Sequence, residues 1–337
     1  MMHCGIEPSK ESVESSSFWF YFHTILRHTR MPLYFLLSGL FFKTYGGFAD
    51  FSLRKVNKLL VPLIFFNAIY IAIRLVLLTI TGFGDKSWFE YMSPTWFLIA
   101  LFSLNVIFYL LFIISNSLFQ SSKSKMVGLF FLSLITGLSG LAIGETDKPL
   151  SYFCCSLTVT PFFFLGYFLK NATDYFYQKS VSAKDIGYLL LLVLLSLTVL
   201  FFRSSDGITK LGFATNNVLM PSVVYYFGSV GVLTILVLSK ILYHYFQFSK
   251  SFVVSYVGRY SVVVLCTHYI ILFAFHSIMK SMNIDVMLRR GIIFTSIIVL
   301  EYFVVIPLCV KYLPKFCAQE DLIPLSILKK SVEKDGK

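Results

Sequence analysis

Charged residues are scarce in this chain of 337 residues. They make up 14% of it, whereas a soluble domain usually carries about 25%, and this scarcity excludes an ordinary soluble enzyme. The six cysteines form no CxxC pair, so neither a disulfide framework nor a metal site is expected. Walker, GxGxxG, HExxH and GxSxG motifs are also absent, which argues against the usual ATPases, dinucleotide enzymes, zinc proteases and serine hydrolases. No tightly bound cofactor is expected.

Long apolar stretches are abundant, since 57% of the residues are hydrophobic. Several stretches approach the roughly 20 apolar residues that cross a bilayer as a helix. Only helices and closed barrels satisfy their backbone hydrogen bonds inside lipid, so the sequence predicts an all-α polytopic membrane protein. About nine transmembrane segments are expected, near residues 18–42, 56–81, 94–114, 126–143, 152–169, 186–202, 218–239, 261–279 and 291–312.

Lysine and arginine are concentrated in alternate loops of this predicted arrangement. The net charge is +12, but no separate basic domain exists, so the charge is interpreted as topology-setting and no nucleic-acid partner is expected. The bias places the C-terminus in the cytoplasm and Met1 outside, as in a multi-pass protein of the cytoplasmic (inner) membrane. One membrane domain is predicted over residues 1–317, followed by a short solvated, lysine-rich tail over 318–337.

Three ionisable residues interrupt the first apolar segment. His23, Arg27 and Arg30 are spaced so that they share one helix face. Ionisable groups inside a bilayer are costly, and two arginines on one face suit an anionic or polyhydroxyl ligand. Alternatively, the three side chains lie at the membrane interface and extend outward into the headgroups.

A second cluster of cations stands at the start of the next segment. Arg54, Lys55 and Lys58 lie just before Pro62 in the stretch FSLRKVNKLLVPL. Basic side chains near a helix start favour phosphate, so a cytosolic nucleotide-bearing donor is one predicted ligand. An anchor that obeys the positive-inside rule explains the same charges.

Two further ionisable residues fall in the C-terminal segments. His268 follows Ser261 by two helical turns, and a membrane histidine of this kind is often only hydrogen-bonded to a neighbouring helix. Glu301 lies deep in the last segment and must be paired or protonated, with Arg74 as one possible partner.

Five stretches, taken together and in order, resemble the acyltransferase family 3 of integral membrane O-acyltransferases. The resemblance covers nearly the whole chain. It is carried by RMPLYFLLSGLFF (Arg30–Phe42), RKVNKLLVP (Arg54–Pro62), TWFLIALF (Thr95–Phe102), PFFFLGYFLK (Pro161–Lys170) and VGRYSVVVLCTHYI (Val257–Ile270).

This resemblance implies an enzyme that moves an acyl group, most often acetyl, from acyl-CoA as co-substrate to a sugar hydroxyl. The acceptor would be a cell-surface or exopolysaccharide glycan or a lipid-linked sugar at the membrane lipid. Arg54, Lys55 and Lys58 match the family's basic motif and would hold the CoA phosphates. Arg30 would orient the acceptor or the acyl carbonyl, with His23, Arg27 and His268 as further candidates.

The opening MMHCG resembles the end of the family's first helix, with His3 at the catalytic histidine position as general base. In the family an arginine precedes this histidine by eleven residues, about three helical turns. That position would lie before Met1, so the first helix is expected to be missing, and its restoration would give ten spans with both termini cytoplasmic.

Two other interpretations of the chain stay open at this stage. One is a transporter or flippase of lipid-linked sugars, although the sequence shows no inverted repeat of the kind that such proteins carry. The other is a truncated, inactive acyltransferase.

Overall fold

Every regular element that the structure describes is a helix. The computed structural model describes residues 17–81, 95–143, 148–170, 172–197, 219–246, 252–280 and 286–324. The helices belong to two units, which are described in turn: residues 44–102 with 253–337, and residues 8–43 with 103–252.

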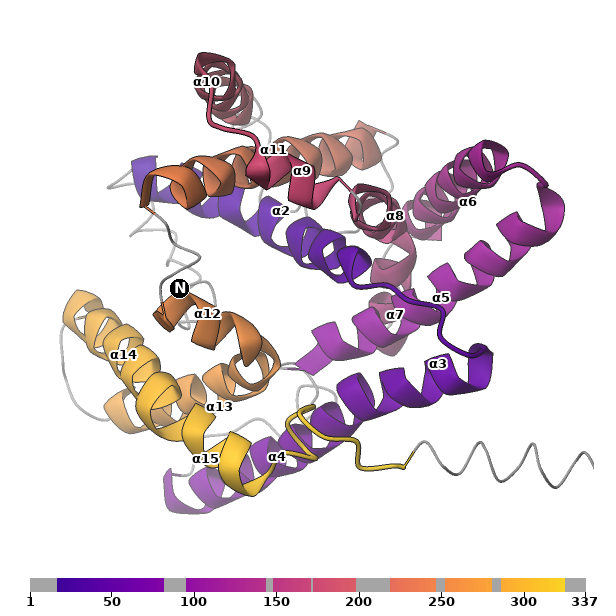
Figure 1. Ribbon diagram of the computed structural model, residues 1–337. Coiled ribbons are helices and arrows are strands. Elements are labelled where there is room, and N and C mark those ends of the chain that lie inside the picture. Colours follow the sequence, from indigo (N-terminus) through magenta and orange to yellow (C-terminus); the bar gives the residue numbers. More distant parts are fainter. Residues whose placement is uncertain are drawn as a thin grey trace, which may run out of the picture. The chain divides into compact units, whose positions relative to one another are not determined.

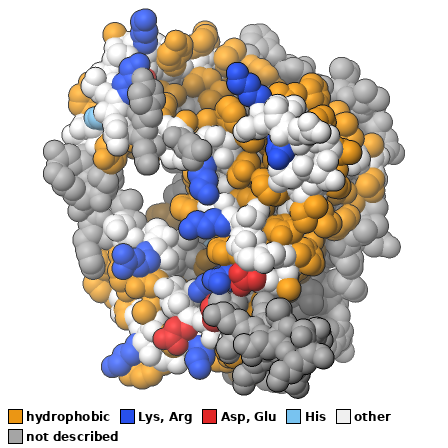
Figure 2. Space-filling view, turned by 45° about the vertical axis from the view of Figure 1, so that its right-hand side comes forward, with side chains coloured by type: hydrophobic (Ala, Val, Ile, Leu, Met, Phe, Trp, Pro, Cys, Tyr) orange, Lys and Arg blue, Asp and Glu red, His pale blue; other side chains and the backbone are white. Residues whose placement is uncertain are grey.

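The predicted all-α polytopic class is confirmed, and helices coincide with all the predicted segments. Within the described ranges, five helical stretches are long and apolar enough to cross a membrane, or six if the bent pair Tyr152–Thr158 and Thr160–Leu169 counts as one span. Large apolar side chains are exposed along these stretches and cover much of the face drawn in Figure 2. The five are Phe48–Ile73, Trp96–Leu118, Ser122–Ile143, Tyr225–Phe246 and Gly291–Tyr312.

The first unit is built from helices of two separate parts of the sequence, residues 44–102 and 253–337 (Figure 1). In it α4 packs against α13, where Tyr70 and Tyr269 meet with ring centroids 5.9 Å apart. Its elements are α3 (Phe48–Lys55), η1 (Val56–Leu60), α4 (Val61–Thr81), the start of α5 (Trp96–Leu118), α12 (Phe252–Arg259), α13 (Ser261–Lys280), α14 (Val286–Leu300), η5 (Glu301–Val305) and α15 (Ile306–Tyr312).

The second unit is arranged around α2, which packs against both α8 and α11 (Figure 1). Its core includes Phe42, whose ring meets those of Phe108, Phe163 and Tyr167 edge-on at 5.0, 5.9 and 5.7 Å. Its elements are α2 (Ser17–Leu40), the rest of α5, α6 (Ser122–Ile143), α7 (Lys148–Thr158), α8 (Thr160–Leu169), α9 (Thr173–Gln178), α10 (Ala183–Leu197) and α11 (Leu219–Phe246).

Prolines shape three of these helices. A proline ring clashes with the carbonyl four residues earlier, and the turns before Pro62 and Pro307 widen into the π-helices η1 and η5. At Pro161 the helix breaks instead, and α7 and α8 meet at 46°. The Tyr225 hydroxyl of α11 donates a hydrogen bond of 2.7 Å to the Thr158 carbonyl beside this break.

An ion pair joins α10 to α11. Lys240 Nζ lies 2.9 Å from Asp185 Oδ1, and the lysine side chain is only 4% exposed. The backbone N–H of Ser182 also donates to Asp185, and together these hydrogen bonds lower the pKa of the Asp185 carboxyl to about 2. A lowered pKa keeps the pair ionised at neutral and mildly acid pH, so its stabilising effect is lost only as the pH falls towards 2.

Two glycines let α2 and α8 approach at backbone distance. A Cβ on Gly39 would overlap the Phe163 carbonyl, and one on Gly166 would overlap the Leu36 carbonyl. Small residues at such crossings are the usual basis of close helix packing in membranes. The contact therefore holds the two helices at a spacing that no larger residue permits.

We expect Gly166→Ala to destabilise the protein by about 1–3 kcal/mol, because the added methyl group forces α2 and α8 apart. Gly187→Ala is the matched control, since its Cβ would meet nothing within 4 Å in α10. That substitution should be neutral or stabilise by up to about 1 kcal/mol through helix propensity. Thermal unfolding in detergent measures both effects, and equal melting temperatures for the two variants would contradict the packing argument.

Candidate functional site

The basic cluster predicted from the sequence lies on α3 and η1. Helix α3 follows Gly47, whose φ of +133° is a conformation that glycine alone adopts easily. Asp50, in the first turn, accepts a hydrogen bond from the Gly46 N–H at 3.2 Å and another from Arg54 Nε at 2.9 Å. A carboxylate there also complements the helix dipole. Asp50 therefore fixes both the start of α3 and the position of the Arg54 side chain.

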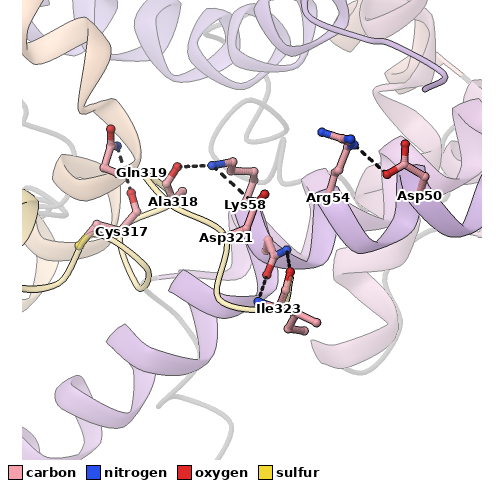
Figure 3. Close-up of polar contacts among 9 residues, drawn as sticks. Asp50, Arg54, Lys58, Cys317, Ala318, Gln319, Asp321 and Ile323 are labelled. Carbon is pink, nitrogen blue, oxygen red and sulfur yellow. Dashed lines mark hydrogen bonds and ion pairs between the residues drawn. The ribbon is translucent and has the colours of Figure 1, made fainter. Parts of the chain in front are cut away.

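Two of the three cations, Arg54 and Lys58, have partly exposed side chains. The Arg54 guanidinium lies 4.6 Å from the Tyr45 ring centroid, and the Lys55 ammonium lies 5.6 Å from that of Phe51. The side chain of Lys58 is 44% exposed. Arg54 and Lys58 extend from the same side of the helix (Figure 3). The arrangement can accept an anion on that side through charge-assisted hydrogen bonds.

The segment after α15 contacts this cluster directly. We call residues 313–324 the C-terminal strap; sequence reasoning treated most of it as a solvated tail. Lys58 Nζ donates a hydrogen bond of 2.8 Å to the Ala318 carbonyl and lies 3.7 Å from Asp321 Oδ1 (Figure 3). The Asn57 side chain donates to the Ile323 carbonyl and accepts from the Ile323 N–H, both at 2.9 Å.

The sequence contained one signal of this contact. Asn57 is a lone amide among Val56, Leu59 and Leu60, and it is fully buried. A buried amide needs partners for both its donor and its acceptor, but the sequence does not show that a segment 266 residues away supplies them.

The predicted residues of the first segments are described less completely. His3 lies outside the described residues. His23 and Arg27 lie in α2, but the description does not extend to their side chains. Arg30 is half-buried in α2. Arg30 belongs to the second unit, whereas the basic cluster belongs to the first.

A second polar group is buried between α13 and η5. Glu301 is 5% exposed, and its Oε1 accepts a hydrogen bond of 2.7 Å from the Thr267 hydroxyl. Its Oε2 is buried and accepts no hydrogen bond from the described part of the chain. The Arg74 side chain, its predicted partner, lies outside that part.

His268 follows Thr267 in α13. Its Nδ1 lies 2.7 Å from the Val264 carbonyl in the preceding turn. Because a carbonyl only accepts, Nδ1 carries the proton, and in the neutral ring Nε2 is the basic nitrogen. This hydrogen bond is made within the residue's own helix.

Comparison with known protein families decides the class of the chain. The acyltransferase domain of acyltransferase family 3 matches residues 1–310. The chain belongs to this family. No curated protein and no solved structure matches it. As a member of acyltransferase family 3, it is a membrane acyltransferase that uses an acyl donor and transfers acyl groups other than aminoacyl groups.

The family match supplies context for Glu301. A buried carboxyl with one oxygen that has no partner among the described residues costs folding free energy, so its presence in a membrane acyltransferase suggests a role other than stability. We expect Glu301→Met to leave the stability unchanged or to raise it by about 1–2 kcal/mol. The Thr267 hydroxyl could then donate its single hydrogen to the Val263 carbonyl, which also lies 2.7 Å from it.

Thermal unfolding of Glu301→Met and Glu301→Gln measures this effect, and parallel assays of acyl transfer show whether the carboxyl is needed for activity. Cys309→Ala, which shortens a nearby buried side chain of α15, is the control for simple packing loss and should be less stable than the wild type. A Glu301→Met protein that is much less stable than wild type would show that the carboxyl is structural.

Proposed function

We propose that this family member moves an acetyl group from acetyl-CoA to a hydroxyl of a cell-surface or exopolysaccharide sugar. The observation that carries the proposal is the basic cluster on α3 and η1, where Arg54 and Lys58 extend from one side with their head groups partly exposed. CoA carries several phosphates, and partly exposed cations on adjacent turns match such a ligand.

The proposed topology places the cluster within reach of cytosolic CoA. The loop charge bias puts the start of α3 and the C-terminus on the cytoplasmic side of the inner membrane. We infer nine spans in this chain. The lipid-linked or polymeric sugar would then enter from the membrane or its outer side.

His3 acts as the general base in the proposed reaction. It takes the proton of the sugar hydroxyl while the hydroxyl oxygen attacks the thioester carbonyl. The new C–O bond forms, the C–S bond breaks, and the CoA thiolate takes up a proton as it leaves. Arg30 orients the acceptor or the acyl carbonyl, and His23, Arg27 and His268 are further candidates for contacts with the acceptor.

His3→Ala should lower glycan acetylation by about 10²- to 10⁴-fold, the usual contribution of a general base. The measurement is the acetyl content of surface glycans from cells that express each variant at equal level. His244→Gln is the control, because His244 lies at the end of α11 and binds the Tyr177 carbonyl. It should acetylate normally, and unchanged acetylation by His3→Ala would remove His3 from the mechanism.

Lys58→Gln should raise the KM for acetyl-CoA about tenfold, because it removes one charge-assisted hydrogen bond to a phosphate. The kcat should change little, since the lost contact is remote from the reacting carbonyl. Lys123→Gln, an exposed lysine at the start of α6, removes the same charge elsewhere and should leave KM unchanged. Equal effects of the two substitutions would mean that only net charge matters.

A further inference from the structure

The C-terminal strap is a folded part of the molecule and not a loose end. Phe316 stacks on Phe65 of α4 with ring centroids 4.4 Å apart, and the Cys317 side chain is fully buried. The two hydrogen bonds from the buried Asn57 side chain hold the Ile323 backbone at a fixed position. The strap also lies beyond residue 310, where the family match ends.

The strap directs a backbone carbonyl at Lys58. Ala318 has a φ of +59°, a left-handed conformation that a residue other than glycine adopts only at a cost. In this conformation the Ala318 carbonyl accepts a hydrogen bond of 2.8 Å from Lys58 Nζ. The surrounding contacts therefore impose this conformation, and its local result is a hydrogen bond to a cation of the basic cluster.

Asp321 lies beside Lys58, but one of its carboxylate oxygens has no hydrogen bond from the described residues. Its Oδ1 is buried and lies 3.7 Å from Lys58 Nζ. That separation is too long for a hydrogen bond, and no other described residue donates one to this oxygen. The carboxylate thus neutralises Lys58 without gaining the hydrogen bond that would stabilise it there.

We propose that Asp321 is a built-in competitor for the donor site, so that the strap restrains acyl-CoA binding until a phosphate of the donor replaces the carboxylate beside Lys58. The inference rests on the proposed function, because it takes the basic cluster to be the site for CoA phosphates. A phosphate can hydrogen-bond to Lys58 at short distance, which Asp321 in this position does not. A carboxylate left 3.7 Å from the ammonium would repel that phosphate, so the two anions exclude each other.

The first test measures CoA binding to the purified full chain in detergent by calorimetry. Asp321→Asn should tighten CoA binding about two- to fivefold, the effect expected for loss of one partly exposed ion pair. Glu320→Gln is the matched control, because Glu320 is the exposed neighbouring acid and has no contact with Lys58 among the described residues. Unchanged or weaker binding by Asp321→Asn, or equal gains in both variants, would overturn the proposal.

The second test releases the strap from its other end. Asn57→Leu removes both hydrogen bonds to Ile323 and keeps the branched shape of the side chain. Faster maleimide labelling of Cys317, located by mass spectrometry, reports the release. CoA should then bind more tightly, and combining this change with Asp321→Asn should add little, because both remove the same contact. Faster Cys317 labelling without tighter CoA binding would refute the inference. If Asn57→Leu does not fold, the Asp321→Asn result decides.

The two hypotheses fail in different ways. If Lys58→Gln weakens CoA binding and Asp321→Asn does not strengthen it, the donor site stands and the competing role of Asp321 is wrong. If Lys58→Gln has no effect on CoA binding, the basic cluster is not the donor site, and both hypotheses are wrong.

Discussion

Proline inside a helix that lipid surrounds is the constraint from which the candidate functional elements follow. Lipid offers no water to replace a lost backbone hydrogen bond, so the protein itself must compensate for each missing donor. Before Pro62 and Pro307 the helix widens into a π-turn, and both widened turns carry a buried polar side chain, Asn57 and Glu301. At Pro161 the helix breaks, and Tyr225 binds the Thr158 carbonyl next to the break. Single-turn π-helices of this kind often mark functional sites.

The buried polar side chains of the two π-turns differ in how completely they are hydrogen-bonded. The nitrogen and the oxygen of the Asn57 amide are each hydrogen-bonded to the backbone of the same residue, Ile323, and this pairing specifies one position for the strap. Glu301 has a partner for one oxygen only within the described residues. A compensated amide stabilises structure, whereas a half-compensated carboxyl is kept against a cost, and this difference separates a structural residue from a candidate functional one.

Sequence reasoning predicted the helical class and the basic cluster because both depend on local patterns. Apolar run length determines where helices lie, and Arg54, Lys55 and Lys58 are adjacent in the chain. It could not find the strap, because Lys58 and Ala318 are 260 positions apart and nothing local links them. The break at Pro161 was missed for a similar reason, since the predicted span over residues 152–169 is continuous in hydrophobicity.

Residues of opposite charge meet Lys58 and Arg54 in different ways, and the difference bears on how an anionic donor would bind. Asp50 is one helical turn from Arg54 and bonds only its Nε, so it orients the guanidinium and leaves the terminal nitrogens available to a ligand. Asp321 instead approaches the ammonium of Lys58 itself, the atom that a phosphate must reach. The first carboxylate belongs to the same helix and cannot leave, whereas the second belongs to a separate segment, which contacts Asn57, Phe65 and Lys58. Among the described residues, the strap is the segment that such a donor would displace from the Lys58 ammonium, and the helix that presents the cations can stay as it is.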